Sequence, residues 1–353
     1  MIDMAKENSF FSDGIDDFPF EHYKLFVDEN QIPMRIDKFL TNQMANMTRN
    51  KVQKLTEKNY VKVNKISVKP SYKIKPNDII QIVKDFPKRD TRLIAEDIHV
   101  DILYQDDDLI IVNKAPGMVV HPSYGHYTGT LLNALKFHIK NFAPFENEVR
   151  PGLVHRIDKN TSGILVVAKT EIALVHLQKQ FFDRTTFRRY RALVWGDFDE
   201  EEGIITGNIG RNFKNRKVMD VFPETEDYGK HAVTHYKVLE CFGYVTLVEC
   251  RLETGRTHQI RAHFKHIGHP LFNDNEYGGD KVLRGTTFSK YKQFVQNCFK
   301  VMPRQALHAK SLGFKHPKNE EWVQFDSDMP QDFSDVLERW RNYTKQRLQK
   351  NEN

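Results

Sequence analysis

Cysteines are few in this chain, and long apolar runs are missing. The three cysteines, Cys241, Cys250 and Cys298, have neither CxxC nor CxxxxC spacing, which argues against a disulfide framework and against a cysteine-based zinc site. No run reaches the roughly 18 apolar residues of a membrane span, and the acidic segment 1–18 lacks the layout of a signal peptide. We therefore expect reduced thiols, a cytoplasmic location and no membrane contact.

Glycine-rich loops for nicotinamide, flavin or nucleotide cofactors are also missing, so no cofactor is expected. The segment LETGRTHQIRAHFKHIGHP (252–270) has four histidines within 12 residues, a pattern that invites a metal interpretation. On a helix, however, His263 lies about 140° from His258 and His266 about 80° from it, and no Cys or acidic side chain completes a set. A basic face, with Arg256 at its start, suits phosphates or an active-site carboxylate better.

Positive charge is concentrated in one part of the chain. Residues 1–30 contain two Lys/Arg against eight Asp/Glu, whereas residues 31–90 contain 14 against five. Such a local excess is typical of a surface that binds a polyanion, although a solvated lysine-rich face is the simpler alternative. Residues 1–30 are acidic and have no regular period over most of their length, so we predict a flexible tail there.

The pattern of residues 31–90 predicts a small α/β domain. Apolar spacing predicts helices within 35–44 and over 49–59, the second capped by Thr48. The segments YVKVNKISV and SYKIKPNDIIQIV then alternate as strands do. Most basic side chains of the two helices fall off their apolar positions, so they can face a phosphate backbone together while the core stays dry. These residues are Arg35, Lys38, Arg49, Lys51, Lys54 and Lys58.

Residues 91–330 have the pattern of a second, larger domain that follows a charged linker. Strand-like runs outnumber helical ones and do not alternate with them regularly, which favours an α+β domain over a doubly wound one. The strand-like runs include LIIVNK, GILVVAK, YRALVWG, THYKVLE and YVTLVECRL, and the helical ones are EIALVHLQKQFF and THQIRAHFKHI. Residues 331–353 are predicted to form an amphipathic helix that ends in a polar tail.

The segment HRIDKNTSG (155–163) lies between strand-like runs and has two interpretations. Its Asp, Asn, Thr, Ser and Gly residues are those of a turn, which needs no catalytic role. Alternatively, the positive charges of Arg156 and Lys159 keep the Asp158 carboxylate ionised, as a nucleophile or a base must be. The segment alone does not decide between a folding role and a chemical role for Asp158.

Two further patterns have simple interpretations when they are taken singly. A Ser-His-Asp hydrolase built from His155, Asp158 and Ser162 is disfavoured, because three members within eight residues cannot easily converge and no GxSxG motif is present. Tyr190 lies on a predicted strand in TFRRYRALVWG, and a strand tyrosine is most often part of the core.

The first domain resembles the S-four RNA-binding domain, which occurs in a small-subunit ribosomal protein and in many RNA-modifying enzymes. The similarity lies in RIDKFL, TRNKVQKL, VKVN and SYKIKPNDII. Lys65 departs from the pattern, since that family commonly has Gly after the Asn of the strand turn.

Most of the chain resembles the RluA-type RNA pseudouridine synthases, in the RluD-like branch that has an N-terminal S-four domain. The blocks are DDDLIIVNKAPGMVVHP, GTLLNAL, RPGLVHRIDKNTSGILVVAKT, RYRALVWG, LETGRTHQIRAHFKHIGHPLFNDNEYGG and RQALHAKSLGF. The resemblance implies a mixed, mainly antiparallel sheet and an enzyme that isomerises uridine in RNA without cofactor or metal. It further implies that Asp158 is catalytic, that Arg256 pairs with Asp158, and that Tyr190 contacts the base.

The resemblance also assigns Arg156 to the gap that the flipped uridine leaves in the RNA, and we place His155 with it among the RNA-binding residues. Large-subunit ribosomal RNA is the expected substrate and a monomer the expected state. Two alternatives remain open: a synthase that acts on transfer RNA, and a non-catalytic RNA-binding factor of ribosome assembly.

Overall fold

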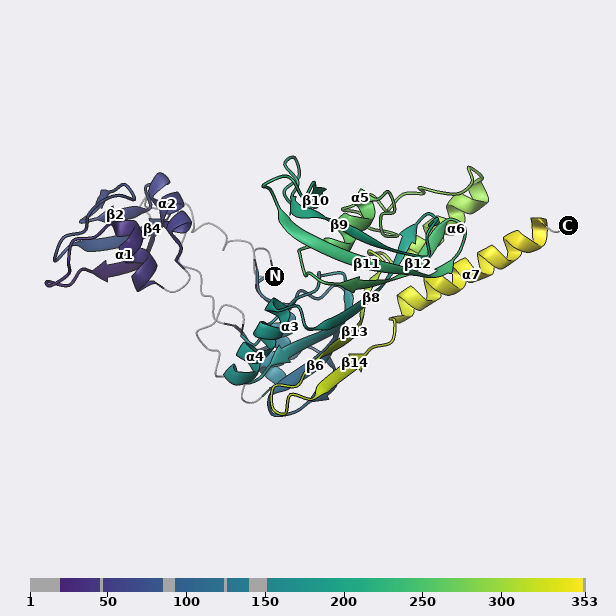
Figure 1. Ribbon diagram of the computed structural model, residues 1–353, viewed down its shortest axis with the longest axis horizontal. Coiled ribbons are helices and arrows are strands. Elements are labelled where there is room, and N and C mark those ends of the chain that lie inside the picture. Colours follow the sequence, from purple (N-terminus) through teal and green to yellow (C-terminus); the bar gives the residue numbers. More distant parts are fainter. Residues whose placement is uncertain (1–19, 45–46, 85–92, 124–125, 140–150, 352–353) are drawn as a thin grey trace, which may run out of the picture. The chain divides into compact units, whose positions relative to one another are not determined.

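The computed structural model describes residues 20–44, 47–84, 93–123, 126–139 and 151–351 (Figure 1). The chain divides into two compact units, Met1–Thr91 and Arg92–Asn353. None of the described helices is long and apolar enough to cross a membrane.

The first unit is a small antiparallel sheet with two helices. Its elements are β1 (Phe20–Phe26), α1 (Ile36–Gln43), α2 (Arg49–Glu57), β2 (Val61–Val63), β3 (Ile66–Ser67) and β4 (Ile79–Lys84), with sheet order β1-β4-β2-β3. Both predicted helices are confirmed, and the Thr48 hydroxyl accepts a hydrogen bond from the Lys51 amide as an N-cap should. Ile36, Leu40, Val52 and Ile80 are fully buried in its core.

One expectation for this unit is wrong, since the predicted tail 1–30 includes β1. This strand pairs with β4 from Phe20↔Lys84 to Phe26↔Ile79. It was missed because FEHYKLF mixes charged and apolar residues and occupies an edge of the sheet, where one partner supplies all the pairing. The rest of the predicted tail, residues 1–19, lies outside the described residues.

The turn between β2 and β3 has an unusual backbone. Val63 pairs with Ile66, so Asn64 and Lys65 form a two-residue loop, and both have positive φ, 48° and 71°. This is the geometry of a type I′ turn, which suits Asn and Gly but strains a lysine. Asn64 is tied down further, because its side chain accepts from the Ile79 amide and donates to Asp78.

The second unit is built on a ten-stranded mixed sheet, as the sequence predicted. The order is β10-β9-β11-β12-β8-β13-β7-β6-β5, with β14 beside β13, and among these pairs only β13 and β7 run parallel. The strands are β5 (Asp101–Gln105), β6 (Leu109–Lys114), β7 (Ser162–Ala168), β8 (Phe187–Trp195), β9 (Glu202–Arg211), β10 (Met219–Phe222), β11 (Lys230–Cys241), β12 (Val245–Leu252), β13 (Leu307–Lys315) and β14 (Trp322–Asp326). The helices are α3 (Leu131–His138), α4 (Glu171–Phe182), α5 (Gln259–His266), α6 (Ser289–Val301) and α7 (Gln331–Asn351).

Strand β7 is buried along its whole length because helices or strands cover both of its faces. Ile164 and Val166 pack with residues of α4, whereas Leu165 and Val167 pack with residues of α3 on the opposite face. The two-residue period of a strand explains this division. A continuous apolar run, SGILVVA, is therefore what this position requires.

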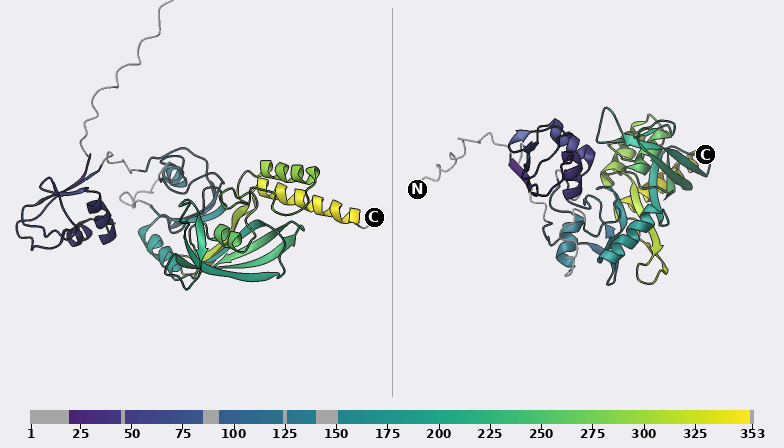
Figure 2. Two further views of the ribbon diagram at one scale, coloured as in Figure 1. Left: turned by 90° about the horizontal axis from the view of Figure 1, so that it is seen from above. Right: turned by 60° about the vertical axis from the view of Figure 1, so that its left-hand side comes forward.

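The C-terminal helix α7 belongs to the second unit. Phe333 and Trp340 are fully buried in a cluster with Val295 of α6 and Trp195 of β8. Figure 2 shows α6 and α7 side by side. The predicted C-terminal helix is thus confirmed over Gln331–Asn351, and it contributes to a core.

Candidate active site

The second unit contains a pocket of about 480 Å³, a size that suits one nucleotide-sized ligand. Its walls come from the loop before β7, from β8, and from the segment that joins β12 to α5. Asp158, Tyr190 and Arg256, which the sequence singled out, all line it. The structure therefore brings together three residues that are far apart in the chain.

The loop that carries Asp158 is held by backbone geometry at its far end. Gly163 has φ 113°, and a Cβ there would lie 2.2 Å from the carbonyl oxygen of Ala309 on the neighbouring strand β13. Only glycine fits so close to another backbone. Within the loop, the Thr161 amide donates to the Asp158 carbonyl, which closes the turn that the sequence predicted.

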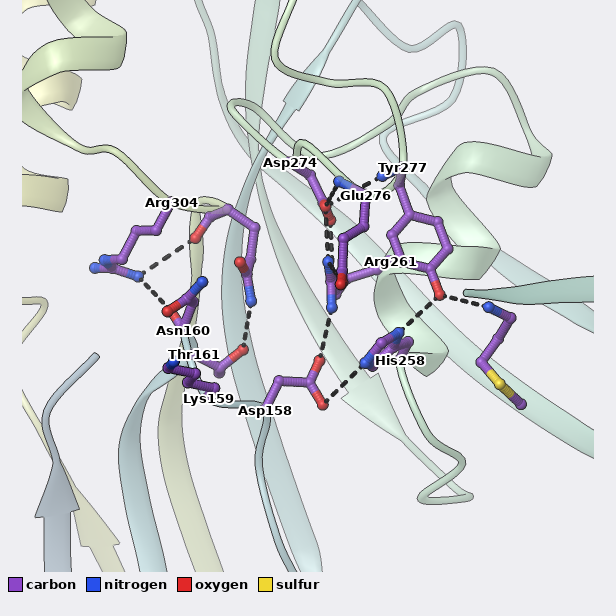
Figure 3. Close-up of polar contacts among 12 residues, drawn as sticks. Asp158, Lys159, Asn160, Thr161, His258, Arg261, Asp274, Glu276, Tyr277 and Arg304 are labelled. Carbon is purple, nitrogen blue, oxygen red and sulfur yellow. Dashed lines mark hydrogen bonds and ion pairs between the residues drawn. The ribbon is translucent and has the colours of Figure 1, made fainter. Parts of the chain in front are cut away.

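Side chains from other elements hold the rest of this loop (Figure 3). The Lys114 ammonium donates to the carbonyl of Lys159 at 3.0 Å, and Arg304 donates to that of Asn160 at 3.2 Å. Gln305 reaches the Thr161 hydroxyl at 3.4 Å. Each of the residues 158–161 thus has a partner of its own, which fixes the direction of the Asp158 side chain.

The carboxylate of Asp158 faces Arg261 and His258, as Figure 3 shows. Arg261 Nη1 lies 3.3 Å from Asp158 Oδ2, and His258 Nε2 lies 3.8 Å from Oδ1. The Arg261 side chain is buried and has two further carboxylate partners. It donates to Asp274 through Nε at 2.7 Å and through Nη2 at 2.8 Å, and Nη2 also donates to Glu276 at 2.6 Å. Its guanidinium also covers the ring of Tyr277 at 4.7 Å.

The charge of Arg261 is secured by its neighbours. Burial would lower its pKa, but the carboxylates of Asp274, Asp158 and Glu276 outweigh that effect and raise the pKa above its ordinary value. The guanidinium is therefore a permanent cation beside Asp158. It orients that carboxylate through a charge-assisted contact.

The pairing of Asp158 with Arg256 that we predicted is wrong. Arg256 lines the same pocket, but its Nε donates to the carbonyl of His231 at 3.1 Å. The cause is the start of α5: His258 has a left-handed backbone, φ 55°, and the helix begins at Gln259. Arg256 therefore precedes the helix and faces elsewhere, while Arg261 lies in the first turn.

His258 forms a hydrogen-bonded chain behind the carboxylate. Its Nδ1 lies 2.9 Å from the Tyr277 hydroxyl, which accepts from the Met219 amide at 2.8 Å. Burial lowers the pKa of His258, so the ring is neutral near pH 7. Because the amide can only donate, the hydroxyl is free to donate to Nδ1, and the single ring proton then lies on Nε2, toward Asp158.

The sequence placed His258 and Arg261 on a basic face suited to an active-site carboxylate but did not pair them with Asp158, and it missed Tyr277. The available signal was the acidic segment NDNEYGG, which begins seven residues after the end of α5. A buried arginine requires carboxylates, and this segment supplies Asp274 and Glu276.

Tyr190 is 8% exposed on β8 and lines the pocket. Burial and the charge of Asp158 raise its pKa, so its hydroxyl is protonated near pH 7. Arg156 also lines the pocket, with an exposed side chain.

The neighbouring His155 lines the pocket and also has a structural role, while its contact with RNA stays a prediction. Its Nε2 accepts from the Val166 amide at 3.1 Å and its ring stacks on Phe181 at 4.6 Å. Burial lowers its pKa to about 3, so it carries no positive charge for a phosphate.

Residues of the hydrolase and metal patterns have separate partners in the structure. Ser162 Oγ lies 3.0 Å from His308 Nδ1, far along the chain from His155. His263 contacts Thr234, and His269 contacts the Trp195 carbonyl, so these two histidines of segment 252–270 point to separate partners.

Comparison with known proteins agrees with this geometry. Residues 108–266 match the family model described as RNA pseudouridylate synthase, and residues 34–80 match the S4 domain. An uncharacterized RNA pseudouridine synthase of Chlorobaculum parvum is 47% identical over 90% of this chain and 97% of its own length. The chain belongs to the RNA pseudouridine synthases.

Other relatives extend the comparison. Ribosomal large subunit pseudouridine synthase D of Zymomonas mobilis is 39% identical to this synthase over 86% of the chain and 93% of its own length. Human RNA Pseudouridylate Synthase Domain Containing 4 matches in structure with a TM-score of 0.53 and 24% identity, over 68% of this chain and 93% of that one, and so shares the fold.

The basic residues of the S4 domain lie on its surface, as the helical spacing predicted. The side chains of the same helices that face the core are buried, namely Ile36, Phe39, Leu40 and Val52. The basic side chains are all exposed: Arg35, Lys38, Arg49, Lys51, Lys54 and Lys58. Arg35 contacts the carboxylate of Asp37 through Nε and Nη2. These charges are therefore exposed while the core of the domain stays apolar.

Proposed function

We propose that this synthase isomerises uridines of large-subunit ribosomal RNA and that Asp158 is its catalytic carboxylate, without any cofactor. The observation that carries the proposal is the contact of Asp158 with the permanently charged Arg261 inside a nucleotide-sized pocket. An ionised carboxylate held in one direction is what an attack on the sugar, or removal of a proton from it, requires.

The reaction sets clear demands on the pocket. The bond between the sugar carbon and N1 of uracil breaks, and its electron pair stays with the base. The base then turns, and C5 forms a bond to the same sugar carbon. The proton on C5 leaves and N1 gains one, so every atom of uridine is retained. Asp158 acts at the sugar carbon, either as nucleophile or as the base that starts an elimination.

Tyr190 forms the wall against which the base rests. Its ring lies on the same pocket as Asp158, and its hydroxyl is protonated in the free enzyme. Once C5 is bonded to the sugar, its proton passes to a basic atom of the pocket. The Asp158 carboxylate can take it directly, whereas the Tyr190 hydroxyl can take it only if it has given its own proton to N1.

The rim of the pocket suits a nucleic acid backbone. Arg156 and Arg184 are exposed there, Arg256 is partly exposed, and Phe182 beside them is 86% exposed. Guanidinium groups bind phosphates, and an exposed aromatic ring can stack on a base next to the flipped uridine. Support for ribosomal RNA comes from the relatives whose names specify the large ribosomal subunit, at 36–39% identity.

A tritium-release assay tests the catalytic assignment. RNA labelled at C5 of its uridines is incubated with wild type, Asp158→Asn and Asp158→Ala, and with Asp101→Asn as a control on the exposed strand β5. We expect both Asp158 variants to lose at least about 10³-fold in rate, the scale for removing a reacting group. Undiminished release by the Asp158 variants would refute the assignment.

Pseudouridine mapping in a deletion strain tests the substrate. We expect pseudouridines to be lost from large-subunit ribosomal RNA and restored by wild type but not by Asp158→Asn. Loss confined to transfer RNA would replace the proposed substrate. A strain without any loss, together with wild-type protein that releases no tritium, would favour a non-catalytic assembly factor.

A further inference from the structure

Arg188 is a buried cation in the wall of the pocket. It is 7% exposed and lies two residues before Tyr190 on β8, so the two side chains share one face of the strand. Arg189, between them, faces the other way and is exposed. Arg188 and Tyr190 both line the pocket.

No carboxylate among the described residues forms an ion pair with Arg188. Its contacts are with the carbonyl oxygens of Leu252 and Glu253, at 3.5 and 3.4 Å, and with the ring of Phe181 at 5.6 Å. Its Nε is buried and has no hydrogen-bond acceptor. Burial accordingly lowers the pKa of the guanidinium from its ordinary value.

Other buried arginines of this unit are matched by acids. Arg261 has Asp274 and Glu276 as partners, and Arg304 contacts both oxygens of Asp332. A buried cation without such a partner is costly, and proteins rarely keep one unless something else supplies the negative charge. Arg188 is therefore arranged for an anion that the free protein lacks.

We propose that Arg188 binds the base of the target nucleotide and stabilises the negative charge that the base carries once its bond to the sugar has broken. The inference rests on the proposed function. The electron pair released at N1 is delocalised to the carbonyl oxygens of uracil, which are acceptors for the N–H groups of a guanidinium. The charge disappears again when C5 bonds to the sugar carbon. A cation already fixed at that position needs no reorganisation during the reaction.

The depth of Arg188 favours the base over a phosphate. Phosphates stay on the outside of a flipped nucleotide, where the exposed Arg156 and Arg184 lie at the rim of the pocket. Arg188 is instead buried beside Tyr190, against which the base rests. A phosphate contact is the alternative that the experiment must distinguish.

Gly255 provides the room for this guanidinium. A Cβ at Gly255 would lie 2.9 Å from Arg188 Nη1, closer than side chains normally approach. Gly255→Ala therefore displaces the guanidinium while keeping its charge and the rest of the strand.

The test compares Arg188→Met, Arg188→Lys and Gly255→Ala with wild type, and uses Arg189→Met as a matched control on the opposite face of β8. Two quantities are measured for the full chain on C5-tritiated ribosomal RNA: the single-turnover rate at saturating enzyme, and the RNA affinity as a function of salt. We expect Arg188→Met to lose about 10²- to 10³-fold in single-turnover rate, the range for one donor to a developing charge. Its RNA affinity and salt slope should remain near those of wild type. The single-turnover rates of Arg188→Lys and Gly255→Ala should lie between those of Arg188→Met and wild type.

Thermal unfolding separates this role from a structural one. Because Arg188→Met removes an unmatched buried charge, its Tm should stay the same or rise by about 2–4 °C. Weaker RNA binding with a salt slope reduced by about one unit, and an unchanged rate at saturation, would show a phosphate contact and overturn the proposal. So would wild-type rates in Arg188→Met and Gly255→Ala. Absence of tritium release by wild type on every RNA would instead refute the proposed function.

Discussion

Asp158 and Arg261 lie 103 residues apart in the chain, yet their side chains meet at 3.3 Å in the pocket. Arg261 also forms ion pairs with Asp274 and Glu276, so three carboxylates share one guanidinium. The orientation of the proposed catalytic group therefore depends on residues that never reach the substrate. Variants of Arg261 and of its partners should affect catalysis and folding together.

Arg261→Gln and Arg256→Gln should have different effects, although both residues line the pocket. Loss of Arg261 leaves Asp274 without its cation, so we expect a decrease of about 3–5 kcal/mol in the free energy of unfolding, along with a large fall in kcat. Arg256→Gln should weaken RNA binding and raise KM while kcat and stability stay near wild type. Urea unfolding and steady-state kinetics check both. A larger fall in kcat for Arg256→Gln would contradict the pairing seen here.

His258 should orient Asp158 through its Nε2 proton. Gln places an N–H near the Nε2 position, whereas Asn is too short to do so, but Asn tolerates the left-handed backbone of residue 258 far better. We expect His258→Asn to be as stable as wild type and yet lose about tenfold or more in kcat, within the usual range for an acid–base or orienting group. His258→Gln should keep more activity at a cost in stability. If kcat falls only as far as stability falls in both variants, His258 has a purely structural role.

Acid should destabilise the protein well above the pH at which carboxylates titrate. Burial lowers the pKa of His155 to about 3 and those of His263 and His308 to about 4. The unfolded chain binds protons at these sites below about pH 6.5 while the folded chain does not. The free energy of unfolding should therefore fall from pH 6.5 to 5, by on the order of 1 kcal/mol per histidine per pH unit.

The variant His308→Asn tests this pH effect. Its free energy of unfolding should change less steeply with pH, because unfolding then takes up about one proton fewer. Urea unfolding at several pH values measures it. A free energy of unfolding that is constant between pH 6.5 and 5 would show that these rings are accessible to protons in the fold.

Lys65→Gly should stabilise the S4 domain. Lys65 has φ 71° in a two-residue turn, a conformation that costs a side-chain-bearing residue about 1 kcal/mol or more. Glycine removes this cost, but it also increases the entropy of the unfolded chain, which offsets part of the gain. We therefore expect the free energy of unfolding to rise by about 0.5–1 kcal/mol. Hydrogen exchange of the β2 and β4 amides in the full chain measures the gain, with Lys62→Gly as a control that should destabilise β2. Faster exchange in Lys65→Gly would contradict the strain.

Local patterns predicted the elements that bury a regular apolar face. The run EIALVHLQKQFF coincides with α4, and GILVVAK coincides with β7 to within one residue at each end, because packing on a sheet demands those periods. Strand β9, GIITGNIGR with Glu202 before it, was not singled out, since its glycines suit neither a helix nor an ordinary strand. In the structure Gly203 and Gly210 make room for the rings of Tyr236 and Tyr228.

The candidate site was predictable only in part, for a physical reason. Asp158 could be found because its turn and its charged neighbours are adjacent in the chain. The identity of its arginine could not, because it depends on where α5 begins and on the left-handed backbone of His258. The neighbours of that side chain, Tyr277 and Asp158, come from other parts of the chain.

The support of the catalytic loop reaches nearly to the end of the chain. Arg304, which holds the Asn160 carbonyl, is itself held by Asp332 at the start of α7. During translation the loop at 155–163 is therefore made long before its last support emerges from the ribosome. A nascent chain that ends before Asp332 contains every residue that lines the pocket and still lacks one anchor of the loop. Asp332 therefore supports the catalytic loop from outside the pocket, through Arg304.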